Sequence, residues 1–409
     1  MEIIFDKKKW DSFVKEPLNT KIAFSDDGVT IEKKAESAAI VRCVLDEKFE
    51  KGKFYKFTAV AEAETCSNSC SAYIMISQLD KDKNYIIRMY AENNRDNLSE
   101  KSLVFTPEEN CEFIRVDIGL KGKGKAVFKK LSIEETKAPE KRECTIAATR
   151  LNGCKSREEA LDKIKAAAKE AGEAGADLII FGEVIYDFGC GLPIAETAET
   201  QDGVYCTAMK DMAKKYNTYI VINFHEKDED ERIYNTSVLI DRNGEIAGKY
   251  RKTHISFNEF ENGVTAGSEL PVFDTDFGRI GILICWDVYF PEPARVLAEK
   301  GAELIVISTA GNPPHRHIAR AMENGVYVAV SGNGCCPKTS DRTLFASKVI
   351  DPCGEILSAV DEDGEIALAK IDLSERKKIY WLSVAASEAV PNNIFMNEKR
   401  PELYGKICE

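Results

Sequence analysis

The sequence lacks any apolar run of the roughly 18 residues that a membrane-spanning helix needs. Its first residues, Met1 to Lys9, also lack the long apolar core of a secretion signal. Basic residues are also fewer than acidic ones, 56 against 68. The chain of 409 residues carries a net charge of −12, which argues against a nucleic-acid or anionic-membrane partner by bulk electrostatics. We therefore expect a cytoplasmic protein that acts on a small molecule, with no nucleic-acid and no membrane partner.

Cysteine and histidine are not arranged as metal ligands. The 13 cysteines are an odd number spread over the whole length, and only 4 histidines are present. The close pairs Cys66/Cys70 and Cys335/Cys336 have no matching Cys or His pair at the spacing of a zinc site. Phosphate-binding loops and cofactor motifs are missing too. We expect mostly free thiols, no metal and catalysis without a cofactor.

Residues 1–135 read as strands separated by polar turns, without a helix pattern. The run 113–120, for example, alternates apolar and polar side chains, as a half-buried antiparallel strand does. Such a succession predicts a β-sandwich, and the basic run 121–125 within it predicts a solvated hairpin turn. Residues 136–143 are charged, contain a proline and have no periodicity, so they predict a linker.

After the linker, strand and helix patterns alternate. Short apolar runs such as 177–181, 280–284 and 303–308 are bounded by turn residues, which is typical of strands covered by helices. Ser156 and Glu159 form a capping box at the start of a helical pattern. Residues 144–375 therefore predict an α/β layer domain.

Cys285 directly follows the apolar strand 280–284 and precedes Phe290-Pro291-Glu292, which is typical of a first helical turn. A side chain at a strand-to-helix turn projects from a rigid element, and the next backbone N–H groups are free to bind an oxyanion. On its own, a cysteine at this place is more often a small packing residue. The nucleophile hypothesis therefore depends on partners elsewhere in the chain.

Two such partners stand out. Glu183 directly follows the apolar run 178–182. A carboxylate at the end of a buried strand suits general acid/base catalysis. Lys252 lies in the cation-rich stretch 248–254, and alone it is typical of a solvated side chain.

Read in order, Phe181-Gly-Glu183, Tyr250-Arg-Lys-Thr-His254 and Ile284-Cys-Trp-Asp-Val-Tyr-Phe-Pro-Glu292 resemble the Glu-Lys-Cys triad of the nitrilase superfamily, the carbon–nitrogen hydrolases. The resemblance extends from about Cys144 to about Leu373. It implies that the α/β domain is a four-layer αββα sandwich.

The resemblance also implies a role for each residue. Glu183 takes the thiol proton, and Cys285 attacks the substrate carbon to form a thioester. Lys252 and the backbone N–H of Trp286 bind the oxyanion. Family members usually carry a second glutamate after the lysine. Here the loop 256–267 offers Glu259 and Glu261, of which we favour Glu259 and leave Glu261 open.

Cys285-Trp286-Asp287 resembles the nucleophile motif of amide and carbamoyl cleavers more than that of nitrile cleavers. We expect a hydrolase that cleaves a small amide or N-carbamoyl compound to an acid and ammonia or an amine. The alternatives are a nitrilase and a catalytically silent binding or scaffold protein on the same fold. A Cys-His mechanism would need one of His225, His254, His315 or His317 beside the thiol and is disfavoured.

The first 135 residues resemble, in strand pattern, jelly-roll modules that bind carbohydrates or galactose. Trp10, Tyr73, Tyr85 and Tyr90 are candidate sugar-stacking residues, but we expect them to pack instead. Residues 376–409 resemble a family extension that reaches across a dimer, so we expect a homodimer or a higher homo-oligomer.

Overall fold

The computed structural model describes residues 1–14, 17–35, 39–65, 71–93, 99–311, 313–334, 346–381, 385–388 and 403–408. Its contacts divide the chain into unit 1, Met1–Glu140 with Arg376–Glu409, and unit 2, Lys141–Glu375. The cysteine pairs 66/70 and 335/336 lie outside the described residues, and the cysteines with described side chains are free thiols. Within the described ranges, no helix is long and apolar enough to cross a membrane.

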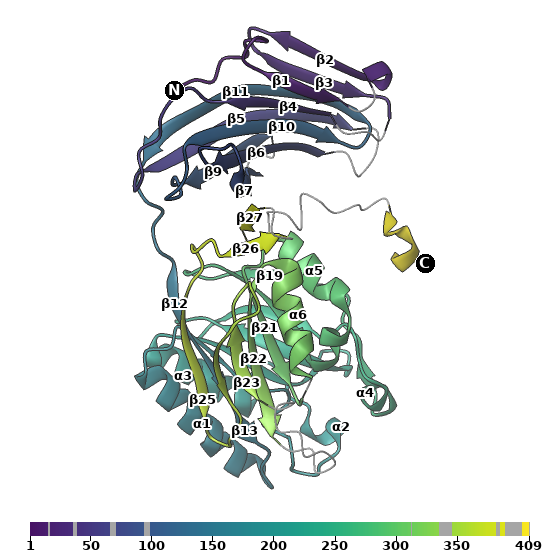
Figure 1. Cartoon of the computed structure of the whole chain (residues 1–409). Helices are drawn as coiled ribbons and strands as arrows, with labels where there is room; N and C mark the ends of the chain where they lie inside the picture. Colours follow the sequence, from purple (N-terminus) through teal and green to yellow (C-terminus); the bar gives the residue numbers. More distant parts are fainter. Residues whose placement is uncertain are drawn as a thin grey trace. The chain divides into compact units, whose positions relative to one another are not determined.

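Unit 1 consists of two β-sheets (Figure 1). The first has the order β1 (Asp11–Val14), β4 (Ala39–Val44), β10 (Phe113–Lys121), β6 (Ser71–Leu79), β7 (Tyr85–Tyr90), β27 (Ala385–Glu388) and β26 (Lys378–Trp381). The second has the order β2 (Thr20–Ser25), β3 (Gly28–Lys33), β11 (Gly124–Thr136), β5 (Phe54–Thr65), β9 (Glu100–Phe105) and β8 (Glu92–Asn93). Strands β26 and β27 come from the predicted C-terminal extension and lengthen the first sheet beside β7.

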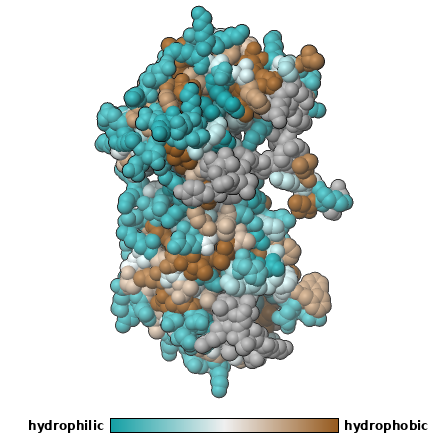
Figure 2. All heavy atoms as spheres, viewed as in Figure 1, coloured by the Kyte–Doolittle hydropathy of each residue, from teal (hydrophilic) through white to brown (hydrophobic). Residues whose placement is uncertain are grey.

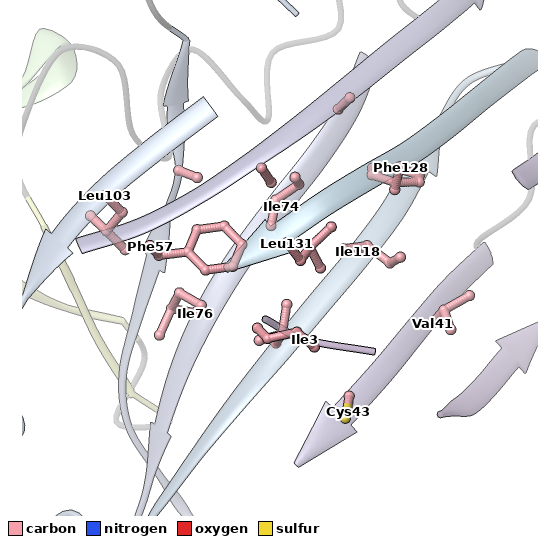
Figure 3. Close-up of a cluster of buried hydrophobic side chains, with 14 of the residues drawn as sticks. Ile3, Val41, Cys43, Phe57, Ile74, Ile76, Leu103, Ile118, Phe128 and Leu131 are labelled. Carbon is pink, nitrogen blue, oxygen red and sulfur yellow. The ribbon is translucent and has the colours of Figure 1, made fainter. Parts of the chain in front are cut away.

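The two sheets share one apolar core (Figure 3). Ile76 and Ile118 from the first sheet pack with Phe57 and Phe128 from the second, because every other side chain of a strand points to the same face. Trp10, one of the candidate sugar-stacking residues, is buried in this core.

The basic run 121–125 is not a hairpin turn, so that prediction is wrong. Strand β10 pairs with β4 and β6, whereas β11 pairs with β3 and β5 of the other sheet. The run therefore crosses from one sheet to the other. Local sequence shows that the chain turns but not which strand is the partner.

Unit 2 also contains two sheets. One has the order β17 (Ile246–Arg251), β16 (Ile233–Ile240), β15 (Tyr219–Lys227), β14 (Leu178–Ile180), β12 (Glu143–Thr149) and β25 (Ile366–Asp372), with β18 (Val264–Thr265) beside β16. The other has the order β19 (Val272–Asp274), β20 (Arg279–Ile284), β21 (Leu304–Thr309), β22 (Tyr327–Gly334), β23 (Ser347–Ile350) and β24 (Ile356–Val360), with β13 (Leu151–Asn152) beside β22.

Helices cover these sheets on opposite sides (Figure 1). Helices α1 (Arg157–Glu173) and α3 (Val204–Tyr216) pack on the sheet of β14 and β15, and α5 (Pro291–Glu299) and α6 (Pro314–Asn324) on that of β20 and β22. Only half of the predicted capping box forms at α1: the Ser156 hydroxyl accepts from the Glu159 N–H, but the Glu159 carboxylate turns to the Lys155 N–H. Between the sheets, Ile146 and Val221 pack with Ile282 and Val306.

The parallel strands of unit 2 bring chemically active residues together. Strands β12, β14 and β15 run parallel, as do β20, β21 and β22. Glu183 follows β14, Cys285 follows β20 directly, and Ala310 follows β21 directly. Carboxyl ends of parallel strands are where α/β folds bind ligands.

The two units differ in surface character. Hydrophilic residues dominate the visible face of unit 1, whereas apolar residues gather on the visible face of unit 2 (Figure 2). Exposed large apolar side chains of unit 2 include Met322 in α6 and Ile356 and Leu357 in β24.

Candidate active site

Glu183 is held in place by its backbone. The side-chain amide of Asn333 donates to its carbonyl oxygen. The next residue, Val184, has a φ of 43°, and its N–H donates to Asn223 Oδ1 at 2.7 Å. A valine with positive φ is strained, so the buried amides must hold this turn. The Glu183 side chain is thereby fixed at the strand end, only 6% exposed.

Cys285 stands at a second strained turn. It has a φ of 38° and opens a short 3-10 helix, η2 (Cys285–Tyr289), which lies between β20 and α5 where the sequence indicated a direct step into the helix. Trp286 is in the first turn of η2, where N–H groups have no partner within the helix. Asp287 anchors the turn: its fully buried carboxylate accepts from the Ile284 N–H at 2.9 Å.

Lys252 follows β17 and is buried, although its sequence surroundings are typical of a solvated lysine. Its Nζ lies 2.8 Å from Glu183 Oε1 and 2.8 Å from each carboxylate oxygen of Glu259. A buried ammonium is tolerated only when it is paired and hydrogen-bonded, and these two carboxylates meet that need.

The two candidate second glutamates lie on α4 (Phe257–Glu261) and point in different directions. Ser256 caps this helix through a capping box with Glu259, which bends the Glu259 carboxylate back to the Ser256 N–H at 2.8 Å and toward Lys252. Glu259 is 8% exposed. Glu261 is exposed at the end of the helix. The structure brings Glu259 into the cluster and leaves Glu261 outside it.

Sequence reasoning missed Asn235 of β16. Its Nδ2 donates to Glu183 Oε1 at 2.9 Å and to Glu259 Oε1 at 2.8 Å. A signal was present in the sequence, because Asn235, Thr236 and Ser237 interrupt an otherwise apolar strand and all three are buried. Consecutive polar residues in a buried strand indicate a hydrogen-bonded site.

The cluster sets the charge state of its members. Burial raises the pKa of the Cys285 thiol to about 12, and the negative charge of Glu183 adds to the rise. The ammonium of Lys252 and hydrogen bonds from Thr309 and Ala310 act in the opposite direction. Burial disfavours the charged form of Lys252, but nearby negative charge, first that of Glu183, outweighs burial and raises its pKa above the ordinary value. Lys252 therefore remains a cation at neutral pH, while the thiol needs a base.

The four histidines lie on three elements or loops of unit 2: His254 after β17, His225 in β15, and His315 and His317 in α6. His254 Nδ1 lies 3.1 Å from Asp287 Oδ1, and its ring stacks on Phe290 with centroids 4.3 Å apart. His225 is buried in β15, and burial lowers its pKa to about 4, so it is neutral at physiological pH. His315 is exposed on α6, and His317 is buried there.

Two stacked aromatic rings and an arginine side chain follow the nucleophile. The Trp286 ring stacks on Tyr289 with centroids 4.4 Å apart, and the Arg316 guanidinium lies 4.1 Å from the Tyr289 ring centroid. Trp286 is 38% exposed, so its ring faces solvent directly after Cys285.

Residues 145–380, more than half of the chain, match the sequence model of the family described as carbon-nitrogen hydrolase. The chain belongs to the carbon-nitrogen hydrolase family. The family prediction made from the three motifs is confirmed, and the chain is a hydrolase of carbon–nitrogen bonds.

Curated relatives match more than half of this carbon-nitrogen hydrolase. The "Probable nitrilase C965.09" of Schizosaccharomyces pombe is 34% identical over 247 residues, which are 56% of this chain and 85% of that protein. The "Omega-amidase NIT2" of Danio rerio is 29% identical over 245 residues, 56% of this chain and 88% of that protein.

Solved structures are similar as well. An amidase from Nesterenkonia sp. is 26% identical with a TM-score of 0.51, covering 64% of this chain and 96% of the amidase. Nit3 of Saccharomyces cerevisiae, a nitrilase superfamily member, is 24% identical with a TM-score of 0.52, covering 57% of this chain and 93% of Nit3, and this likeness supports the fold alone.

Proposed function

We propose that this hydrolase cleaves the carbon–nitrogen bond of a small amide or N-carbamoyl compound through a thioester on Cys285. One observation carries the proposal. The buried Lys252 ammonium lies 2.8 Å from both Glu183 and Glu259, in the cluster that also sets the pKa of Cys285. A cation, a base and a thiol that share a water-poor site suit acyl transfer.

The first step needs Glu183. With its pKa raised to about 12, the Cys285 thiol is protonated at neutral pH and is a weak nucleophile. The Glu183 carboxylate takes the proton as the sulfur attacks the substrate carbonyl carbon, so the carbon–sulfur bond and the new carboxyl O–H form together.

The second requirement is a site for the oxyanion. We assign this role to the Lys252 ammonium, which lies 2.8 Å from Glu183 Oε1, and to the N–H of Trp286, the residue directly after Cys285 in η2. Each oxyanion donor typically lowers the barrier by about 3 kcal/mol. Glu259 supports the oxyanion indirectly, since it holds Lys252 in place.

Glu183 then returns its proton to the departing nitrogen, and ammonia or an amine leaves. Water attacks the thioester with Glu183 again as base, which releases the acid and restores the thiol. These reaction steps need neither a metal nor a cofactor.

The substrate class is proposed from the nucleophile motif. Cys285-Trp286-Asp287 resembles amide and carbamoyl cleavers, and relatives named omega-amidase and citrullinase are in agreement. The relative named probable nitrilase favours nitrile cleavage as the second candidate.

Ammonia release from the purified protein over a panel of amides, N-carbamoyl compounds and nitriles tests the proposal, with Cys285→Ala as the control. We expect release from an amide or carbamoyl compound and none from Cys285→Ala. Release from nitriles alone would favour the second candidate. A protein inert on the whole panel would favour a silent scaffold.

We extend the proposal to the rest of the chain. Unit 2 is proposed to be the four-layer αββα sandwich, and unit 1 a jelly-roll module with a packing role. Exposed Met322, Ile356 and Leu357 support assembly into a homodimer or a higher homo-oligomer. A monomer in analytical ultracentrifugation would contradict assembly, and heat on titration with a glycan panel would contradict the packing role.

A further inference from the structure

We propose that Asn235 is a positioning residue that selects which oxygen of Glu183 acts as the base. The proposal rests on the proposed function, because it concerns the proton that Glu183 exchanges with Cys285. Asn235 is 2% exposed and lies in β16, at the centre of the cluster formed by Glu183, Lys252 and Glu259.

The two oxygens of Glu183 differ in their surroundings. Oε1 accepts from Lys252 Nζ at 2.8 Å and from Asn235 Nδ2 at 2.9 Å. Oε2 accepts from the Ala310 N–H at 3.0 Å. A carboxylate oxygen has about two acceptor positions. Among the residues that the structure describes, Oε1 is therefore saturated, whereas Oε2 retains one position for a proton.

The backbone N–H of Ala310 links Oε2 to the nucleophile. The Ala310 N–H that meets Oε2 also forms a hydrogen bond that lowers the pKa of the Cys285 thiol. Oε2 and the thiol are thus neighbours of the same N–H group. In the proposed arrangement, Oε2 is therefore the oxygen that takes the thiol proton.

The orientation of the Asn235 amide follows from its neighbours. Asn223 must turn its Nδ2 toward β16, because the Thr236 carbonyl at 3.1 Å can only accept. Asn223 Nδ2 also donates to Asn235 Oδ1 at 2.9 Å, while the Val184 N–H occupies Asn223 Oδ1 at 2.7 Å. The oxygen of Asn235 therefore faces Asn223, and its Nδ2 faces the two carboxylates.

These hydrogen bonds form a chain that leads from the strained backbone at Val184 back to the Glu183 carboxylate. It runs from the Val184 N–H through Asn223 and Asn235 to Glu183 Oε1, and the side chains of Asn223, Asn235 and Glu183 are buried. Chains of buried hydrogen bonds stiffen one another. Without the Asn235 donor, Oε1 would keep Lys252 alone, and the carboxylate could turn Oε2 away from the thiol.

The test compares Asn235→Ala with Ser237→Ala. Ser237 Oγ accepts from the same Asn223 amide at 3.0 Å but contacts neither carboxylate, so its loss controls for damage to the strand. We expect Asn235→Ala to lower kcat about 10- to 100-fold, with KM changed less than threefold, as for supporting residues of other sites. Ser237→Ala should stay within twofold of the wild type. A kcat of Asn235→Ala within threefold of the wild type would overturn the proposal.

Asn235→Asp tests whether Asn235 acts as a hydrogen-bond donor or only fills space, because only the donor role changes the pH dependence of activity. It keeps the side-chain shape, but an ionised Asp cannot donate to Glu183. The groups that face it are Glu183, Glu259, Lys252 and the neutral His225, its register partner on β15. We expect activity that falls as pH rises and the new carboxyl loses its proton. A pH profile parallel to that of the wild type would contradict the donor role.

Crystal structures of the wild type and Asn235→Ala give a readout that does not need turnover. We expect the Glu183 carboxylate to turn in the variant and its bond to the Ala310 N–H to be lost. An unchanged carboxylate would overturn the proposal. A wild type inert on every substrate would contradict the proposed function and leave this structural comparison to decide the role of Asn235.

Discussion

The Tyr250 hydroxyl donates a hydrogen bond of 2.7 Å to Asp287 Oδ2 and so joins the strand before Lys252 to the turn that holds Cys285. The other oxygen of Asp287 accepts from the His254 N–H at 3.0 Å. The lysine and the cysteine are therefore held relative to each other through a single buried carboxylate.

Replacing Asp287 should destabilise this junction strongly. Asp287→Ala removes the carboxylate that accepts from the N–H groups of Ile284 and His254 and from the Tyr250 hydroxyl. We expect this loss to cost about 2–4 kcal/mol of unfolding free energy. Tyr250→Phe removes one bond and should cost about 1 kcal/mol. Urea unfolding of both variants measures the difference. Equal losses would show that Asp287 acts through Tyr250 alone.

Glu259 and Glu261 offer a matched pair on one short helix. Glu259→Gln removes the negative charge that pairs with the Lys252 ammonium, and we expect kcat to fall about 10- to 100-fold. Glu261→Gln changes an exposed acid at the helix end and should leave kcat within twofold. Steady-state kinetics of the two variants decide between them, and the opposite ranking would make Glu261 the second glutamate.

Lys252→Met should cost both activity and stability. The substitution removes the oxyanion donor and leaves two buried carboxylates without a cation, so we expect no measurable turnover and a loss of about 3–5 kcal/mol. Adding Glu259→Gln removes one of the two charges and should restore part of the stability without restoring turnover. Near-normal turnover in either protein would rule out the assigned role of Lys252.

Glu226 makes the stability of the protein depend on pH. Burial would raise its pKa, but Arg251, Lys249 and Thr236 outweigh burial and lower the pKa from 4.5 to about 2. A lowered folded-state pKa gives stability that is present above the unfolded-state value and lost as pH falls through the folded-state value. We expect a loss of about 3 kcal/mol between these two pKa values, taking 1.36 kcal/mol per pKa unit.

Urea unfolding at a series of pH values measures this loss. Glu226→Gln should flatten the pH dependence in the acidic range. Glu229→Gln changes an exposed acid two residues after the end of β15, the strand that contains Glu226, and should reproduce the wild-type curve. A steep acidic loss that persists in Glu226→Gln would place its origin in other carboxylates.

The sequence allowed several strands of each unit and the three motifs to be recognised, because apolar periodicity and strand-end chemistry are local. It did not reveal that Lys252 is buried, since the carboxylates that pair with it lie far along the chain or on the next helix. It also favoured Glu259 over Glu261 without deciding between them, because the capping box that turns Glu259 inward becomes visible only when Ser256 is known to start a helix.

Long-range pairing explains the other differences. The basic run 121–125 turns the chain, but the pairing of β10 and β11 with strands of different sheets is set by the packing of the whole unit. Asn235 and Asp287 went unassigned for the same reason. Each acts through hydrogen bonds to residues on other elements, and neither has a local pattern that names its partners.

Cys285 is proposed to carry the acyl group during turnover. Mass spectrometry of peptides from protein quenched in acid while it turns over an amide measures this directly. We predict that the peptide containing Cys285 gains the mass of the substrate's acyl group, and that Cys285→Ala shows neither the adduct nor ammonia release. If the wild type shows no adduct on Cys285 and Cys285→Ala releases ammonia at the wild-type rate, Cys285 is not the nucleophile.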